Sequence, residues 1–432
     1  MHDAIQNGSY RFGEFSIYPS DRRLFHGAGS LSLPPKAFDA LHLLVRNHGS
    51  LVPRTEIIAT LWPGIHVTEA NLTNIIVLLR KLLGREAIQT VSKFGYRFTL
   101  PVSAEPGVRQ STYATFIRGK ELLTERTIES IASAREFFWI ALADDPNFAS
   151  GWAWLGRTCR LIEKFRGERP GSPSLAPNLT DAAFRRAFLL DPDLACAHQF
   201  YTPFQIDTGR ALEAMTRLAS RLRLRGEDPE TLAGLVQVFR VCGLLEESIA
   251  AHDRAIALDP AIKTSVAHTH FLLGNYASVF ETYTGNQFYL DAAAWAALGN
   301  RDRAINLLRT RLNRPEISSM MSGMIASLLA ALEGKAEEAI AITEATQAFQ
   351  EPEARFYFAR HCGMLNLVMP TVELVRRARL EGFYSVYALQ NDIAFACIRL
   401  HPEFQREVEE AKHMEANARQ LLHLNLGPDF KK

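Results

Sequence analysis

Apolar residues in the first hundred positions change their spacing several times, and each spacing predicts a different element. Between Tyr10 and Ile17 they stand close enough for short strands. A Pro-Pro pair at 34–35 suits the first turn of a helix. After it, apolar residues recur at i, i+3, i+6 and i+7, which places them on one helix face that Gly49 ends. These residues are Phe38, Leu41, Leu44 and Val45.

Two more helices and a hairpin follow. The first is short, and the Pro-Gly pair at 63–64 is expected to stop it. The second is expected to begin near Glu69, whose carboxylate suits a helix N-terminus. Its expected buried stripe is Leu72, Ile76, Leu79 and Leu83. In the hairpin, Tyr96 and Phe98 alternate towards the core, with Arg97 pointing outward. The pattern predicts three helices that share one core, with a hairpin at each end.

The order of these motifs resembles the OmpR/PhoB-type DNA-binding domain, and its CadC- and HilA-like branch most closely. The motifs are L-P-P-K-A-F-D-A-L-H-L-L-V (33–45), T-E-I-I-A-T-L-W-P-G (55–64), N-L-T-N-I-I-V-L-L-R-K-L-L (71–83) and I-Q-T-V-S-K-F-G-Y-R-F (88–98). The resemblance covers about residues 10–101. It implies an α+β winged helix-turn-helix fold with double-stranded DNA as its partner.

The face of the third helix opposite its buried stripe is expected to enter the major groove. Helical spacing puts Ala70, Asn74, Val77 and Lys81 on that face, with Thr73, Leu78 and Arg80 beside it. Asn can read adenine bidentately, and Thr can use its hydroxyl or its methyl group. Arg80 and Lys81 lie towards the C-terminus of the helix and are expected to contact phosphates. Ile75, Val77 and Leu78 are apolar where relatives usually carry polar or basic residues, which predicts a weak grip by one isolated domain.

By resemblance, the wing tip approaches the minor groove or its phosphates. It comprises Ser92, Lys93 and Phe94. Lys93 suits a phosphate because an ammonium group does not form a bidentate fork. Arg54, at the start of the second helix, is a further phosphate candidate, with a solvated surface arginine as the alternative. For the third helix, the alternative is an ordinary core helix that touches no DNA.

The rest of the chain is expected to be all-α and repetitive. Five glycines lie 34, 31, 25 and 35 residues apart, around the roughly 34-residue tetratricopeptide period. They are Gly209, Gly243, Gly274, Gly299 and Gly334. Each is followed five residues later by a small or β-branched residue: Ala214, Ser248, Val279, Ala304 and Ala339. Glycine and alanine are expected to let paired helices approach closely, so that the pairs stack into a solenoid.

These patterns predict a multidomain chain. A winged-helix domain is expected over residues 1–101, a polar Pro- and Gly-bearing linker over 102–110, and tetratricopeptide-like repeats over 111–345. Residues 346–432 are expected to be an irregular C-terminal helical cap to which no function is assigned.

Composition changes this picture little. The net charge is +1, although residues 1–105 hold 11 Lys and Arg against 8 Asp and Glu. Five widely spaced cysteines, never arranged as C-x-x-C, are typical of a reducing cytosol. The longest apolar span, 320–332, is shorter than the about 20 residues of a membrane helix. We therefore expect a cytoplasmic protein without a membrane partner.

No motif for phosphate-loop, dinucleotide or HExxH zinc chemistry occurs, so we expect no cofactor, no metal and no enzymatic activity. The favoured hypothesis is a bacterial transcription regulator. Its winged helix would bind promoter DNA, and its repeats would receive a ligand signal, dock a protein partner or self-associate. The alternatives are an interaction scaffold whose winged helix no longer binds DNA, and an enzyme with a helical-repeat body. The sequence contains no residues that support the enzyme.

Overall fold

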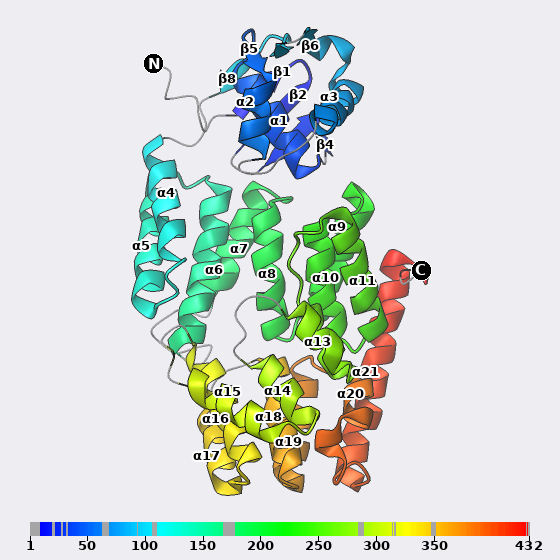
Figure 1. Ribbon diagram of the computed structural model, residues 1–432. Coiled ribbons are helices and arrows are strands. Elements are labelled where there is room, and N and C mark those ends of the chain that lie inside the picture. The colour runs from blue at the N-terminus through cyan, green and yellow to red at the C-terminus, as the bar shows by residue number, and fades with distance from the viewer. Residues whose placement is uncertain are drawn as a thin grey trace. The chain divides into compact units, whose positions relative to one another are not determined.

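The structure, a computed structural model, divides into two compact units (Figure 1). The N-terminal unit holds residues 1–117 and 140–146, and the helical unit holds residues 118–139 and 147–432. Two helices contribute to both units, α4 (Gln110–Leu122) and α5 (Ile128–Asp144). The structure describes residues 9–19, 22–26, 29–31, 33–62, 69–92, 94–105, 110–166, 178–283, 289–312, 314, 317–346, 351–428 and 430.

The described part of the N-terminal unit contains two antiparallel sheets, with helices between them in the sequence. The first sheet has the order β4-β3-β2-β1-β8. Its strands are β1 (Ser9–Phe12), β2 (Phe15–Tyr18), β3 (Arg23–His26), β4 (Gly29–Leu31) and β8 (Ser103–Glu105). The second sheet has the order β5-β7-β6. Its strands are β5 (Leu51–Pro53), β6 (Ile88–Val91) and β7 (Gly95–Phe98). Three helices and a short 3-10 helix connect the sheets: α1 (Pro35–Arg46), α2 (Arg54–Leu61), α3 (Glu69–Leu83) and η2 (Arg85–Ala87).

The apolar stripes of this unit are confirmed. Helix α1 begins at Pro35, buries the four residues expected of it and ends at Arg46, just before Gly49. Helix α3 buries the four residues of its predicted stripe. The expected stop of α2 at 63–64 lies outside the described residues. Phe12 of β1 and Phe98 of β7 meet edge to face, with ring centroids 5.1 Å apart, so the two sheets share one core.

Four strands were not predicted, because a hairpin was expected at each end and nothing more. β3 and β4 extend the first hairpin, and β5 adds a third strand to the wing sheet. β8 lies within 102–110, the segment expected to be a linker, and it pairs with β1 through Tyr10 and Ala104. Backbone hydrogen bonds hold so short an edge strand, and they leave no apolar alternation in the sequence.

The described part of the helical unit is all-α, which confirms the predicted fold class. Most of its helices pack as consecutive hairpins (Figure 1). Beyond α4 and α5, the helices are α6 (Ala149–Arg166), α7 (Asn178–Leu190), α8 (Ala195–Asp207), α9 (Ala211–Arg225), α10 (Pro229–Val241), α11 (Leu245–Leu258), α12 (Val266–Leu272), α13 (Tyr276–Thr282), α14 (Leu290–Ala297), α15 (Arg301–Arg311), α16 (Ser319–Leu332), α17 (Ala336–Thr346), α18 (Pro352–Met364), α19 (Val368–Leu380), α20 (Val386–Asn391) and α21 (Pro402–Leu426), with the 3-10 helix η3 (Ile393–Phe395). None of the helices in the described segments combines the length and apolar character needed to cross a membrane.

The five periodic glycines form the turns inside these hairpins. Each has a left-handed φ between 73° and 83°. At Gly334, the glycine N–H donates to the carbonyl of Ala331 and the next N–H, of Lys335, donates to that of Ala330. This is the Schellman pattern, which favours glycine because a Cβ is strained at positive φ. The expected reason, close helix approach, is wrong for three of the five, since a Cβ there would meet nothing within 4 Å: Gly274, Gly299 and Gly334.

The repeats also continue past residue 345, where a terminal cap was expected to begin. Asn366 joins α18 to α19 with φ 59°, and the following N–H, of Leu367, donates to Cys362 as in the glycine turns. Asparagine is the residue that most often replaces glycine at this position. Thr371, five residues later, is fully buried, as are the residues five positions after the five periodic glycines.

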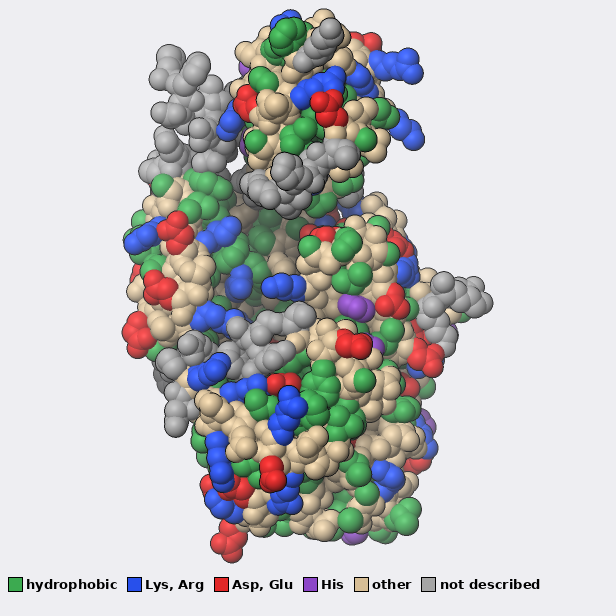
Figure 2. Space-filling view, in the orientation of Figure 1, with side chains coloured by type: hydrophobic (Ala, Val, Ile, Leu, Met, Phe, Trp, Pro, Cys, Tyr) green, Lys and Arg blue, Asp and Glu red, His purple; other side chains and the backbone are tan. Residues whose placement is uncertain are grey.

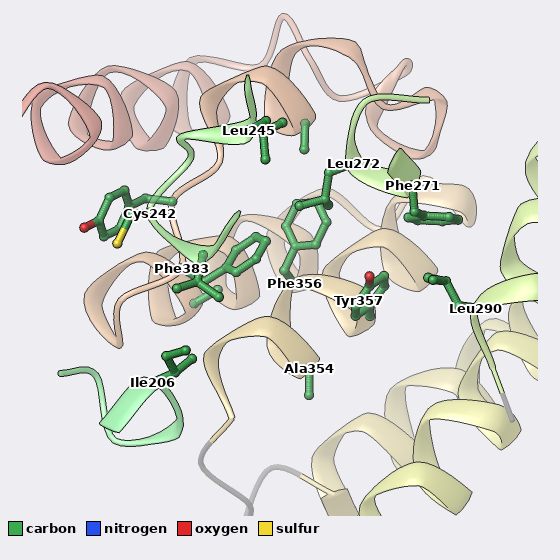
Figure 3. Close-up of a cluster of buried hydrophobic side chains, with 14 of the residues drawn as sticks. Ile206, Cys242, Leu245, Phe271, Leu272, Leu290, Ala354, Phe356, Tyr357 and Phe383 are labelled. Atoms are coloured by element: carbon green, nitrogen blue, oxygen red, sulfur yellow. The ribbon is translucent and has the colours of Figure 1, made fainter. Parts of the chain in front are cut away.

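Helix α18 is central to the helical unit. Eleven of its thirteen residues are buried. Figure 3 shows Phe356 and Tyr357 of α18 among Ile206, Phe271 and Leu290, which come from three other helices. A helix that is buried all round has no single apolar stripe, which is why its sequence looks irregular.

Candidate nucleic-acid interface

Helix α3 presents one face to solvent, opposite the stripe that it buries. All four residues predicted for the centre of that face are exposed: Ala70, Asn74, Val77 and Lys81. Thr73 and Leu78 are exposed beside them, whereas Arg80 is half-buried. Figure 2 shows Lys and Arg side chains projecting from the N-terminal unit on the side of α3. The helix thus offers a mixed polar and apolar face with positive charge near its C-terminal end.

Two polar side chains on this face, Thr73 and Asn74, differ in whether they already form a hydrogen bond within the described part of the protein. The hydroxyl of Thr73 donates to the backbone carbonyl of Glu69, 3.0 Å away, within the same helix. The amide of Asn74 has no hydrogen-bond partner among the described residues, so its donor and acceptor are both available. Asn74 therefore has the side chain best suited to a bidentate contact from this face.

Arg80 points back into the protein. Its Nε and Nη2 donate to the carbonyl of Ile88 at 2.9 and 2.6 Å, and Nη2 also reaches the hydroxyl of Thr90 at 2.7 Å. Both partners lie on β6, so the guanidinium joins the C-terminal half of α3 to the wing. The sequence pattern could not indicate this, because it identifies a cation but not its acceptor. Lys81, the next residue, is exposed and has no hydrogen-bond or ion-pair partner among the described residues.

Arg54 forms a second connection, at the N-terminal end of α3. Its Nη1 lies 2.7 Å from a carboxylate oxygen of Glu69, and its guanidinium stands 5.4 Å from the centre of the Tyr96 ring. Its backbone N–H donates to the carbonyl of Phe94. One residue therefore links the start of α2, the start of α3 and the wing. Sequence reasoning missed Glu69 as the partner, since the two residues are joined only by the fold.

The wing itself is shaped by a glycine. A Cβ on Gly95 would lie 2.0 Å from the carbonyl oxygen of Val52, so only glycine allows β5 and β7 to pair here. At the tip, Ser92 is exposed and Phe94 is 66% exposed. Lys93, the third predicted tip residue, lies outside the described residues. Within the described segments, no three His, Cys, Asp or Glu side chains come together as a metal site.

Comparison with known proteins finds relatives of the N-terminal part of the chain. Residues 28–98 match the family model described as "Transcriptional regulatory protein, C terminal". Transcriptional regulator HilA of Salmonella typhimurium is 29% identical over 102 residues, which are 23% of this chain and 18% of that protein. Transcriptional activator CadC of Escherichia coli is 31% identical over 104 residues, 23% of this chain and 20% of that protein. The chain thus spans about a fifth of the length of the curated relatives that it matches.

Two solved structures are similar to parts of the chain. The DNA-binding domain of Escherichia coli CadC is 30% identical and covers 23% of this chain and 99% of its own, with a TM-score of 0.21. The TPR domain of P58(IPK) is 13% identical and covers 73% of this chain and 99% of its own, with a TM-score of 0.23. The repeat fold itself is established by the helix hairpins and their turns. The family match over residues 28–98 and the winged arrangement of α1–α3 and β5–β7 make the N-terminal unit an OmpR/PhoB-type winged helix-turn-helix domain.

Proposed function

We propose that the chain is a DNA-binding transcription regulator in which α3 enters the major groove. The observation that carries the proposal is the solvent-facing side of α3, where the amide of Asn74 and the ammonium group of Lys81 have no partner among the residues that the structure describes. This face belongs to a domain whose family consists of transcriptional regulatory proteins. Major-groove width admits a helix, and base edges there carry distinct donor and acceptor patterns.

Reading and positioning are assigned to different residues. Asn74 reads an adenine through its amide, and Val77, one helical turn on and 59% exposed, contacts the methyl group of a thymine. Lys81, Ser92 and Lys93 contact phosphates, which fix the register without reading bases. Thr73 lies at the edge of the same face, with its hydroxyl already donated to the helix backbone.

Arg54 and Arg80 fix the position of α3 relative to α2 and the wing. Their guanidinium groups join α3 to α2 and to the wing at its two ends. A helix and a wing that approach one duplex need a fixed mutual geometry, because a small misplacement weakens every contact made at the other end. We therefore assign to both arginines a positioning role in place of the phosphate contacts first expected of them.

The helical unit is proposed to dock a protein partner or a second copy of the chain. Stacked helix pairs offer extended surfaces that suit protein recognition. A weak single-domain grip on DNA also favours such an arrangement, since two linked domains on two half-sites bind more tightly through effective concentration. A regulator-type domain joined to helical repeats favours a non-enzymatic protein.

Selection of random-sequence DNA on the full chain tests the DNA-binding proposal. Fluorescence anisotropy then measures affinity for the selected sequence and for random DNA at several salt concentrations. We expect at least about tenfold preference for the selected sequence, because single base contacts discriminate by about 1–3 kcal/mol. Val77→Ala should lose its effect on affinity when thymine is replaced by deoxyuridine, which lacks the methyl group. Failure of any sequence to be enriched would contradict the proposal.

One observation favours a scaffold in which the winged helix binds protein and not DNA. Val77, Leu78 and Phe94 are exposed to 59%, 37% and 66%, an unusual number of large apolar side chains for a DNA-facing surface. A scaffold would show weak DNA affinity without sequence preference. Lys81→Ala would then leave the salt dependence of the residual binding unchanged.

A further inference from the structure

A cavity of about 170 Å³ lies in the helical unit, between the turn that joins α4 to α5 and helix α6. Its walls are mostly apolar, but they carry two arginines. The lining residues are Leu123, Thr124, Arg126, Ile131, Arg157, Leu161 and Phe165. No carboxylate lines it among the residues that the structure describes, and this combination of two cations with apolar walls requires an explanation.

Arg157 is held in place by aromatic rings and not by an acid. Its guanidinium lies 4.8 Å from the centre of the Trp154 ring and 4.5 Å from that of Phe200. In the described part of the chain, no carboxylate forms an ion pair with it. Elsewhere in the same unit the half-buried and buried arginines commonly have such partners, as Arg160 has in Asp207 and Arg360 has in Asp392. Arg157 is thus a preorganised cation whose N–H groups have no hydrogen-bond acceptor within the described segments.

Arg126 brings a second positive charge to the same cavity. It occupies the α4–α5 turn with φ 56°, a left-handed conformation that costs a non-glycine residue about 1 kcal/mol. Burial, and then the charge of Arg126, lower the pKa of Arg157, whereas the nearby Cys196 thiol raises it by less. Arg126 is exposed, so water screens part of its repulsion from the half-buried Arg157, but an anion placed between the two guanidinium groups would be attracted by both.

We propose that this cavity binds a small organic carboxylate with an apolar body. Guanidinium groups match the geometry of a carboxylate, to which they donate paired hydrogen bonds. Leu123, Ile131, Leu161 and Phe165 would cover the apolar part of the ligand. The size fits an aromatic acid, since an apolar cavity of about 150 Å³ admits benzene. The site is independent of the DNA-binding surface and of the proposed function.

Benzoate is the probe of choice, with benzamide as its uncharged isostere. Calorimetry on the full chain is expected to give a dissociation constant of the order of 1 mM for benzoate, as befits a ligand of this size. Benzamide should bind at least about tenfold more weakly, because it lacks the charge that the arginines recognise. All titrations are made at constant ionic strength with chloride as the balancing anion.

Two variants locate the site. Arg126→Asn removes a cation while keeping a residue that tolerates left-handed φ, so folding should be preserved and benzoate affinity should fall about three- to tenfold. Arg118→Ala is the matched control, because Arg118 is exposed, pairs with Glu121 at 3.2 Å and does not line the cavity. Its affinity for benzoate should equal that of the wild type.

Three results would overturn the proposal. The first is no benzoate binding to the wild type up to about 10 mM. The second is equal affinity for benzoate and benzamide, which would show that the anion is not recognised. The third is equal affinity of Arg126→Asn and Arg118→Ala for benzoate, which would place the binding elsewhere.

Discussion

Replacement of Arg80 should loosen the wing, whereas replacement of its neighbour Lys81 should weaken phosphate binding. Both are cations on the same turn of α3, and both were expected from the sequence to contact DNA. In the structure, Arg80 donates to Ile88 and Thr90 of β6, while Lys81 is exposed. Arg80→Ala and Lys81→Ala therefore form a matched pair with opposite expected effects.

The expected loss of stability in Arg80→Ala follows from three hydrogen bonds of the guanidinium group. Arg80 donates twice to one carbonyl, at 2.9 and 2.6 Å, and once to a hydroxyl at 2.7 Å. A hydrogen bond from a charged donor contributes about 1.5–3 kcal/mol when buried, and partial exposure reduces this. We expect Arg80→Ala to lower the local stability of β6 by about 1–2 kcal/mol, a factor of about 5–30 in its opening equilibrium.

Hydrogen–deuterium exchange of the full chain measures the first effect, and a salt titration of DNA affinity measures the second. In Arg80→Ala, peptides covering β6 and β7 should exchange faster, while the slope of log affinity against log salt concentration stays as in the wild type. In Lys81→Ala, exchange should be unchanged and the slope should fall by about one unit, because one phosphate contact is lost.

The reasoning fails if the two variants behave alike. If Arg80→Ala lowers the salt slope by about one unit and leaves the exchange of β6 unchanged, the guanidinium contacts phosphate. Its bonds to Ile88 and Thr90 would then not persist in solution.

In the recognition helix, Asn74→Ala is expected to reduce the ratio of affinities for selected and random DNA about 5- to 150-fold, the equivalent of one lost bidentate contact; an unchanged ratio in competition binding would contradict it. Gly95→Ala should remove DNA binding and raise wing exchange, because its Cβ would lie 2.0 Å from the Val52 carbonyl. Gly334→Ala should lower the free energy of unfolding, measured in urea, by about 1 kcal/mol. The added Cβ would meet no atom within 4 Å, so the loss comes from the strained φ of 73°. Gly334→Asn should cost less, and equal losses would refute the strain argument.

Within the N-terminal unit, elements with their own apolar face could be predicted from the sequence. The stripe of α3 is visible because a helix that buries one side repeats its apolar residues at helical spacing. Strands β5 and β8 have three residues each, and β5 buries Val52 alone. They are held by hydrogen bonds to strands far away in the sequence, as Tyr10 is aligned with Ala104. Such pairing depends on the folded sheet edge and leaves no periodic signal.

The candidate site shows the same division. The exposure of Asn74 and Lys81 follows from helix geometry, since both stand opposite the buried stripe. The engagement of Arg54 by Glu69 and of Arg80 by Ile88 does not, because each pair is formed by folding between separate elements. Helical spacing therefore predicts which side chains face outward, but it does not predict which of the cations already form hydrogen bonds within the protein.

In the repeats, the right positions were predicted for a partly wrong reason, and the difference matters for the extent of the array. If the glycines served close packing, a repeat without glycine would fall outside the pattern, and the array would end near residue 345. Because they serve a left-handed turn, asparagine can take the place of glycine, and Asn366 with φ 59° marks a further hairpin. The buried position five residues later, Thr371, supports the same register. The physical requirement that these turns share is therefore a backbone conformation, and the spacing of glycines alone does not reveal the hairpin of α18 and α19.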